Sequence, residues 1–177
     1  MNRSKMKSFI QSLNADEAFQ VLIAFINENP DRMKTIYDIA LNIVGDADAD
    51  AVMNDVYCEL SNLDTDELYG RSGRTSHGYF DPGDVAWEMF EEALQPFIFE
   101  MTKNQRRSLP SAAKIHCIGI IKGLMNYEKD SNSDFKDWVI DAPSEFIETV
   151  VDEWKKGNPT DDDIAEVMNI ISRGDKI

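Results

Sequence analysis

An acidic cluster is the first group of residues whose spacing could support chemistry. Asp46, Asp48 and Asp50 follow the D-x-D-x-D pattern that opens a calcium-binding loop. Such a loop also needs a glycine at its sixth position and a bidentate carboxylate at its twelfth, and these positions hold Ala51 and Tyr57. We therefore interpret the aspartates as the solvated start of a helix, where the helix dipole favours carboxylates, and predict no metal site.

A histidine and a cysteine stand side by side at His116 and Cys117, as a thiol nucleophile and its base would require. Adjacent residues of a helix point about 100° apart, so this pair cannot share one site unaided. No G-x-S-x-G or H-E-x-x-H motif accompanies them, and Cys58 forms no C-x-x-C pair. We predict that Cys58 and Cys117 are buried, reduced thiols, and we predict no catalytic residue, no bound cofactor and no enzyme activity. The alternative left open is a metal-dependent hydrolase whose carboxylates converge only in three dimensions.

Positive charge is concentrated at Arg71, Arg74 and His77, which lie among glycines. Arginines beside exposed backbone N–H groups are what an anion site uses. The helix that follows begins with Asp81 and Asp84, whose carboxylates would compete with a phosphate. Two interpretations stay open here. The favoured one is a segment anchored by internal Arg–Asp pairs, and the other is a partner or anion site.

Composition limits the classes of partner. A chain of 177 residues fits one domain, residues 1–177, in which roughly 70% of the unfolded surface can be buried. The net charge of −15 repels phosphate backbones and anionic lipid, so we expect neither nucleic acid nor membrane as a partner. No apolar run approaches the ~18 residues of a membrane span or forms a signal-peptide core. These features favour a cytoplasmic protein.

The elements that carry these residues are predicted to be helices. Asn14 and Glu17 form a capping box ahead of an apolar stripe that ends before Pro30, and a second stripe runs from Pro30 to Gly45. These two helices should pack as an antiparallel hairpin. No stretch alternates with period two over a strand's length. We expect an all-α fold of eight or nine helices, arranged as a stack of antiparallel hairpins of HEAT-like or TPR-like type or as an irregular bundle.

Two helices are predicted to form the centre of this fold. One begins at Asp81 and Pro82 and contains Pro96, where we expect a kink or a restart. The other covers residues 110–127 and is apolar around most of its circumference, which indicates a central position. Gly119 and Gly123 lower helix propensity in it, so we expect that they allow a neighbouring helix to approach closely.

The stretches ELYGRSGR and HGYFDPGDVAWEMFEEALQPF resemble a microbial helical-repeat module associated with SWIM-type zinc-finger proteins. In that family an arginine- and glycine-rich turn, a Gly-Tyr-aromatic step and an Ala-Trp helix precede a helical hairpin, and Arg71, Gly78, Tyr79 and Trp87 fill those places. The C-x-C and C-x-H ligands of the finger are absent, so no zinc or nucleic-acid role carries over. The resemblance implies a HEAT-like or TPR-like stack.

These observations favour a non-catalytic scaffold or adaptor that binds another protein or a peptide. Stacked helices expose grooves suited to a peptide, and arginine and aromatic residues are enriched in interface anchors. The alternative is that the aromatic residues fix the segment 71–80 to the core. The candidate partner-binding residues are Arg71, Arg74, His77, Tyr79, Phe80 and Trp87.

Overall fold

The computed structural model describes residues 2–44, 47–75 and 78–174. Over these ranges the chain is all-α, with nine α-helices, two 3₁₀ helices and one two-stranded sheet, which confirms the predicted fold class. Its contacts group residues Met1–Val44 into unit 1 and residues Gly45–Ile177 into unit 2. Two compact units can unfold together as one domain, so the single domain 1–177 stays a prediction.

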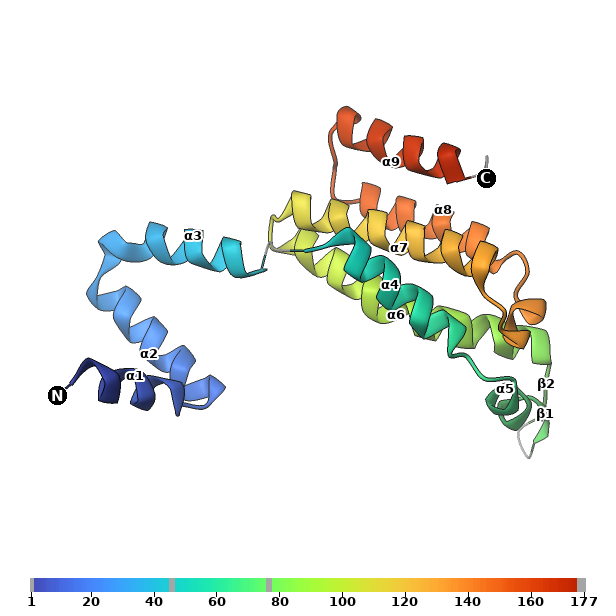
Figure 1. Ribbon diagram of the computed structural model, residues 1–177, viewed down its shortest axis with the longest axis horizontal. Helices are drawn as coiled ribbons and strands as arrows, with labels where there is room; N and C mark the ends of the chain where they lie inside the picture. The colour runs from blue at the N-terminus through green and yellow to red at the C-terminus, as the bar shows by residue number, and fades with distance from the viewer. Residues whose placement is uncertain (1, 45–46, 76–77, 175–177) are drawn as a thin grey trace. The chain divides into compact units, whose positions relative to one another are not determined.

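Unit 1 consists of α1 (Arg3–Gln11), α2 (Ala15–Glu28), η1 (Pro30–Arg32) and α3 (Met33–Val44) (Figure 1). The predicted capping box is present, because Asn14 Oδ1 accepts from the Glu17 N–H at 2.9 Å and Glu17 Oε2 accepts from the Asn14 N–H at 3.0 Å. The predicted antiparallel hairpin of α2 and α3 is wrong. The 3₁₀ turn η1 separates the two helices, and contacts between them are sparse.

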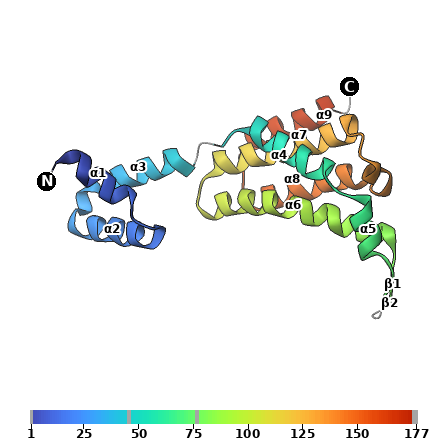
Figure 2. The same cartoon turned by 60° about the horizontal axis from the view of Figure 1, so that its bottom comes forward.

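Unit 2 is built around α7. This helix packs against α4, α6, α8 and α9, which confirms its predicted central position (Figures 1 and 2). Its buried side chains join those of α6 and α8 in one apolar core. The elements of unit 2 are α4 (Ala49–Ser61), α5 (Thr65–Arg71), β1 (Gly73–Thr75), β2 (Gly78–Phe80), α6 (Pro82–Arg106), α7 (Pro110–Asp130), η2 (Asp134–Trp138), α8 (Ala142–Lys155) and α9 (Asp161–Gly174).

Two glycines bring α4 and α7 unusually close together. A Cβ atom added at Gly119 would lie 2.6 Å from Val52 Cβ, and one added at Gly123 would lie 2.6 Å from Val56 Cβ. Both distances are far below the 3.5–4.0 Å of a favourable carbon–carbon contact. The predicted role of these glycines in close helix approach is therefore confirmed.

The start and the middle of α6 both follow from its sequence. Asp81 caps the helix, since its Oδ1 accepts from the Gly83 N–H at 2.8 Å, and Pro82 takes the first helical position. The helix then runs through Pro96 without interruption, so the predicted restart does not occur.

A short hairpin precedes α6. Strands β1 and β2 pair antiparallel, with Arg74 opposite Tyr79. Gly73 and Gly78 have φ angles of +89° and +133°, which favour glycine. Three-residue strands are too short to show a period-two pattern, which explains why the sequence did not indicate them.

Candidate functional site

The end of unit 2 that carries α5, β1 and β2 (Figure 1) has several exposed aromatic side chains. We define the hairpin surface as Tyr69, Arg74, Tyr79, Phe80 and Trp138. Its four aromatic side chains remain 36–69% exposed. Arg74 and Tyr79 are directly opposite in the hairpin, so their side chains lie on one face of it, whereas Phe80, the next residue of β2, lies on the other face. The ring of Tyr69 meets that of Trp138 edge-on, with 5.9 Å between centroids.

Arg71 has a structural role beside this surface. Its guanidinium donates to Glu92 Oε2 and to Glu67 Oε1, each at 2.7 Å, and so links α5 to α6. The hydrogen bond to Glu92, followed by the one to Glu67, raises the pKa of Arg71 above its ordinary value. Arg71 is thus paired internally, as the favoured interpretation predicted, but its partners are glutamates, so the predicted Arg–Asp pairing is wrong for this residue.

The other predicted residues differ in how they are placed. Arg74, Tyr79 and Phe80 are exposed and belong to the hairpin surface. Trp87 is partly buried, and its ring packs against Phe146 at 5.5 Å between centroids, so it contributes to the core. His77 lies outside the described residues. A role in partner binding stays a prediction for all of them.

The sequence analysis missed Tyr69 and Trp138. Tyr69 lies in the short helix α5, and Trp138 ends the 3₁₀ helix η2, far along the chain. Tyr69 lies within the stretch ELYGRSGR but fills none of the family positions named for it, and Trp138 belongs to no motif. Only their aromatic type could have suggested them, because no local sequence signal predicts that α5 and η2 meet.

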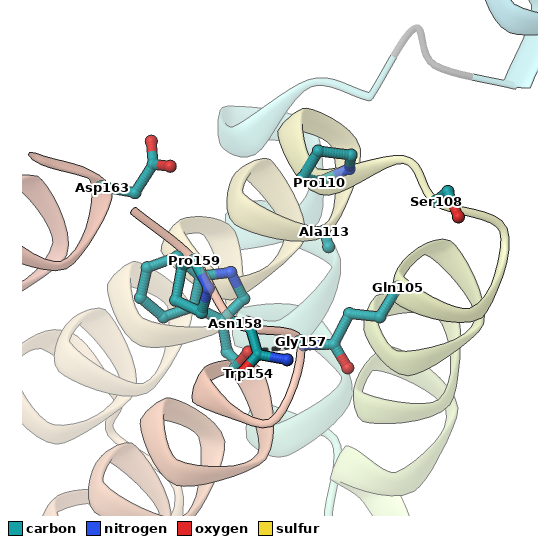
Figure 3. A pocket seen from close by; sticks show the side chains of 9 residues that line it. All are labelled: Gln105, Ser108, Pro110, Ala113, Trp154, Gly157, Asn158, Pro159 and Asp163. Atoms are coloured by element: carbon teal, nitrogen blue, oxygen red, sulfur yellow. Dashed lines mark hydrogen bonds between the residues drawn. The ribbon is translucent and has the colours of Figure 1, made fainter. Parts of the chain in front are cut away.

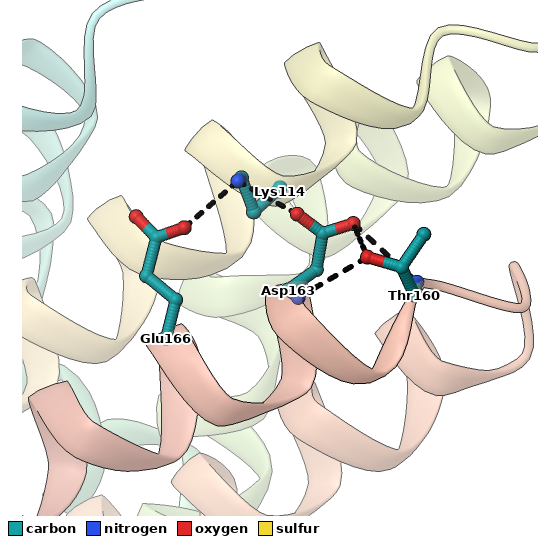
Figure 4. Close-up of polar contacts among 4 residues, drawn as sticks. All are labelled: Lys114, Thr160, Asp163 and Glu166. Carbon is teal, nitrogen blue, oxygen red and sulfur yellow. Dashed lines mark hydrogen bonds and ion pairs between the residues drawn. The ribbon is translucent and has the colours of Figure 1, made fainter.

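A polar network fastens α9 to α7 (Figure 4). Lys114 Nζ donates to Asp163 Oδ1 at 2.8 Å and to Glu166 Oε2 at 2.9 Å. Thr160 Oγ1 donates to Asp163 Oδ2 at 2.6 Å and accepts from the Asp163 N–H at 3.2 Å, which caps the start of this helix. The bond from Lys114 is the main cause that lowers the pKa of Asp163, and the bond to Asp163 is the main cause that raises the pKa of Lys114.

A cavity of about 380 Å³ lies between the turn after α6 and the turn after α8 (Figure 3). Gln105 Nε2 donates across it to the Trp154 carbonyl at 2.6 Å. Ser108 and Asn158 take left-handed backbone conformations, with φ of 57° and 52°, where the two helices end. Asp163 at its edge is already paired with Lys114. The polar groups of Gln105 and Asp163 therefore serve helix packing.

A larger groove of about 820 Å³ runs between α4, α7, α8 and α9. Apolar side chains line it from all four helices: Met53, Met125, Ile147 and Ile171. Charged residues from α7 and α8 also line it, and one of them, Lys122, is paired with Asp50 at 3.0 Å. Methionine adapts to different partner shapes, so a groove of this kind is suited to an apolar helix face.

The residues considered for catalysis have different surroundings in the structure. Cys117 is buried, as predicted, and burial raises the pKa of its thiol to about 12, whereas Cys58 is exposed and its predicted burial is wrong. His116 Nδ1 lies 3.0 Å from the Ala112 carbonyl on its own helix. Asp48 caps α4 by accepting from the Asp50 N–H at 3.0 Å, as predicted for a helix start, whereas Asp46 lies outside the described residues.

The arrangement of possible metal ligands and the lengths of the helices bear on other functions. No three His, Cys, Asp or Glu side chains within them are placed to hold a metal ion together. None of the helices described combines the length and the apolar character that a membrane crossing requires. The metal-dependent hydrolase stays an alternative prediction, which metal analysis of the purified protein tests.

No protein-family model, curated protein or solved structure matches the chain. The resemblance to the helical module of SWIM zinc-finger proteins therefore stays a prediction.

Proposed function

We propose that the chain is a non-catalytic protein-binding scaffold and that the hairpin surface of unit 2 contacts the partner. The observation that carries this proposal is the exposure of four aromatic side chains, together with Arg74, at one end of a well-packed unit. Aromatic and arginine side chains supply most of the binding energy at protein interfaces. Their burial against a partner would remove apolar surface from water.

The part of the hairpin surface that lies on α5 and η2 is held against α6. Arg71 ties α5 to α6 through its two glutamate partners, and α5 and η2 both pack against α6. A surface whose backbone is fixed before binding loses less conformational entropy when the partner arrives. This arrangement supports binding without a large rearrangement.

Charge indicates the chemistry of the partner. Residues 45–177 hold 28 acidic and 13 basic side chains, so unit 2 carries the whole net charge of −15. An acidic surround speeds association with a basic protein and opposes an acidic one. The partner that fits best is a protein or peptide with an apolar centre and a basic rim.

The test is quantitative affinity capture from the native host with three forms of the full chain. The double variant Tyr79→Ser/Phe80→Ser should lose the partner recovered by the wild type. The control Phe99→Ser removes an equally exposed aromatic residue in the second half of α6 and should recover the partner normally. Substitutions at exposed positions change stability by only about 0.5 kcal/mol, so all three forms should unfold alike. Equal recovery by all three forms would contradict the proposal, as would recovery of no partner by any.

A further inference from the structure

Unit 1 exposes an unusual amount of apolar surface. None of the described side chains in α1, α2 and α3 is buried. Twelve large apolar side chains remain 39–75% exposed: Met6, Phe9, Ile10, Phe19, Val21, Leu22, Ile23, Phe25, Met33, Tyr37, Ile39 and Ile43. By contrast, the buried apolar core of the described chain lies within unit 2.

The pattern on α2 shows that this exposure is more than one solvent-facing stripe. Apolar residues at positions 18, 19 and 21–26 cover more than half of the helix circumference. A helix of this kind belongs in the interior of a bundle. Contacts between the helices of unit 1 are too sparse to provide that interior.

The exposed area is large enough for a stable interface. With about 150 Å² for a fully exposed large side chain, the lower end of the range for aromatic residues, the twelve residues present on the order of 1,000 Å² of apolar surface. A standard protein interface buries about 800 Å² per partner. A segment of about 40 residues commonly needs a disulfide, a metal or oligomerisation to fold, and neither cysteine of the chain lies in unit 1.

The distribution of charge favours a second copy of the chain as the occupant. Residues 1–44 contain five basic and five acidic side chains, so two copies of this segment meet without net repulsion. Its charges are also separated along the sequence. Arg3, Lys5 and Lys7 lie on α1, whereas Asp16 and Glu17 begin α2, which allows opposite charges to pair between copies. Contacts through residues 45–177 would instead bring together two surfaces that each carry the net charge of −15.

We propose that unit 1 is a self-association segment: α1, α2 and α3 of two copies combine into one helical bundle whose interior is formed by the twelve apolar side chains. The two segments are identical, so a two-fold symmetric interface is the simplest arrangement that leaves no further surface open. Each dimer then presents two hairpin surfaces.

Sedimentation equilibrium of the full chain tests this proposal. The wild type should have a mass of about twice 20.1 kDa. The variant Leu22→Asp/Phe25→Asp should be monomeric. The control Ile140→Asp places one aspartate on an exposed apolar residue of unit 2 and should remain dimeric.

A second readout separates loss of association from loss of folding. All three tryptophans, Trp87, Trp138 and Trp154, lie in unit 2, so their fluorescence should be the same in every variant. Hydrogen exchange of the α2 amides should slow as protein concentration rises in the wild type but not in Leu22→Asp/Phe25→Asp. A monomeric wild type at its highest soluble concentration would overturn the proposal. A dimer that persists in Leu22→Asp/Phe25→Asp would overturn it as well.

Discussion

Replacing Gly119 by alanine should destabilise unit 2 through one added methyl group. The new Cβ would lie 2.6 Å from Val52 Cβ, 2.7 Å from Val52 Cγ1 and 2.9 Å from the Ala49 carbonyl oxygen. Favourable carbon–carbon contacts begin at about 3.5 Å, so α4 and α7 would have to separate by close to 1 Å. Such a shift would loosen the contacts on both sides of the central helix.

The expected size of the loss follows from two opposing effects. Overpacking of a close interface costs about 1–3 kcal/mol. Alanine recovers up to about 1 kcal/mol through its higher helix propensity, so a mid-range overpacking cost of about 2 kcal/mol leaves a net loss of about 1 kcal/mol. Gly123→Ala should act in the same way against Val56 and the Met53 carbonyl. The double variant should lose less than the sum, since one separation of the helices relieves both clashes.

Urea unfolding followed by tryptophan fluorescence measures this free energy in unit 2. The matched control is Gly70→Ala in α5, where no atom lies within 4 Å of an added Cβ, and this change should stabilise by about 0.5–1 kcal/mol. Adding Val52→Ala should not rescue Gly119→Ala, because Val52 Cβ and the Ala49 carbonyl remain in place. If Gly119→Ala is as stable as the wild type, the close approach of α4 and α7 is refuted.

Other outcomes follow from single side chains. Tyr127→Phe should raise the free energy of unfolding by about 1 kcal/mol, because the Tyr127 hydroxyl is buried without a hydrogen-bond partner among the described residues; a lower value in urea unfolding would contradict this. The Lys114–Asp163 pair should stabilise the packing of α9 fully at pH values above the ordinary aspartate pKa of 3.8 and below the ordinary lysine pKa of 10.5. Its contribution should be lost as pH falls through the lowered pKa of Asp163 or rises through the raised pKa of Lys114. In hydrogen exchange of α9, Asp163→Asn should therefore differ from the wild type near neutral pH and match it in acid. In native protein, a thiol reagent at mildly alkaline pH should modify exposed Cys58 but not Cys117, whose burial raises its pKa to about 12, and should modify both after unfolding.

The sequence determined the local features of this protein. The caps formed by Asn14, Asp48 and Asp81 each join residues no more than three positions apart, so residue type and spacing were enough to predict them. The central position of α7 was also readable, because apolar residues around a whole helix require neighbours on every side. The glycines within α7 indicated close helix approach because they lower helix propensity inside a helix that must pack against neighbours.

Tertiary structure decided which distant residues meet. Arg71 pairs with Glu92 across 21 positions, and Tyr69 meets Trp138 across an even longer separation, so both contacts depend on the path of the chain between them. The exposed apolar surface of unit 1 has the same origin. A stripe such as that on α2 shows that a helix needs a partner, but the pattern is the same whether that partner is the next helix or another molecule. A periodic apolar face specifies how much surface must be buried, and only the arrangement of the helices determines what is available to bury it.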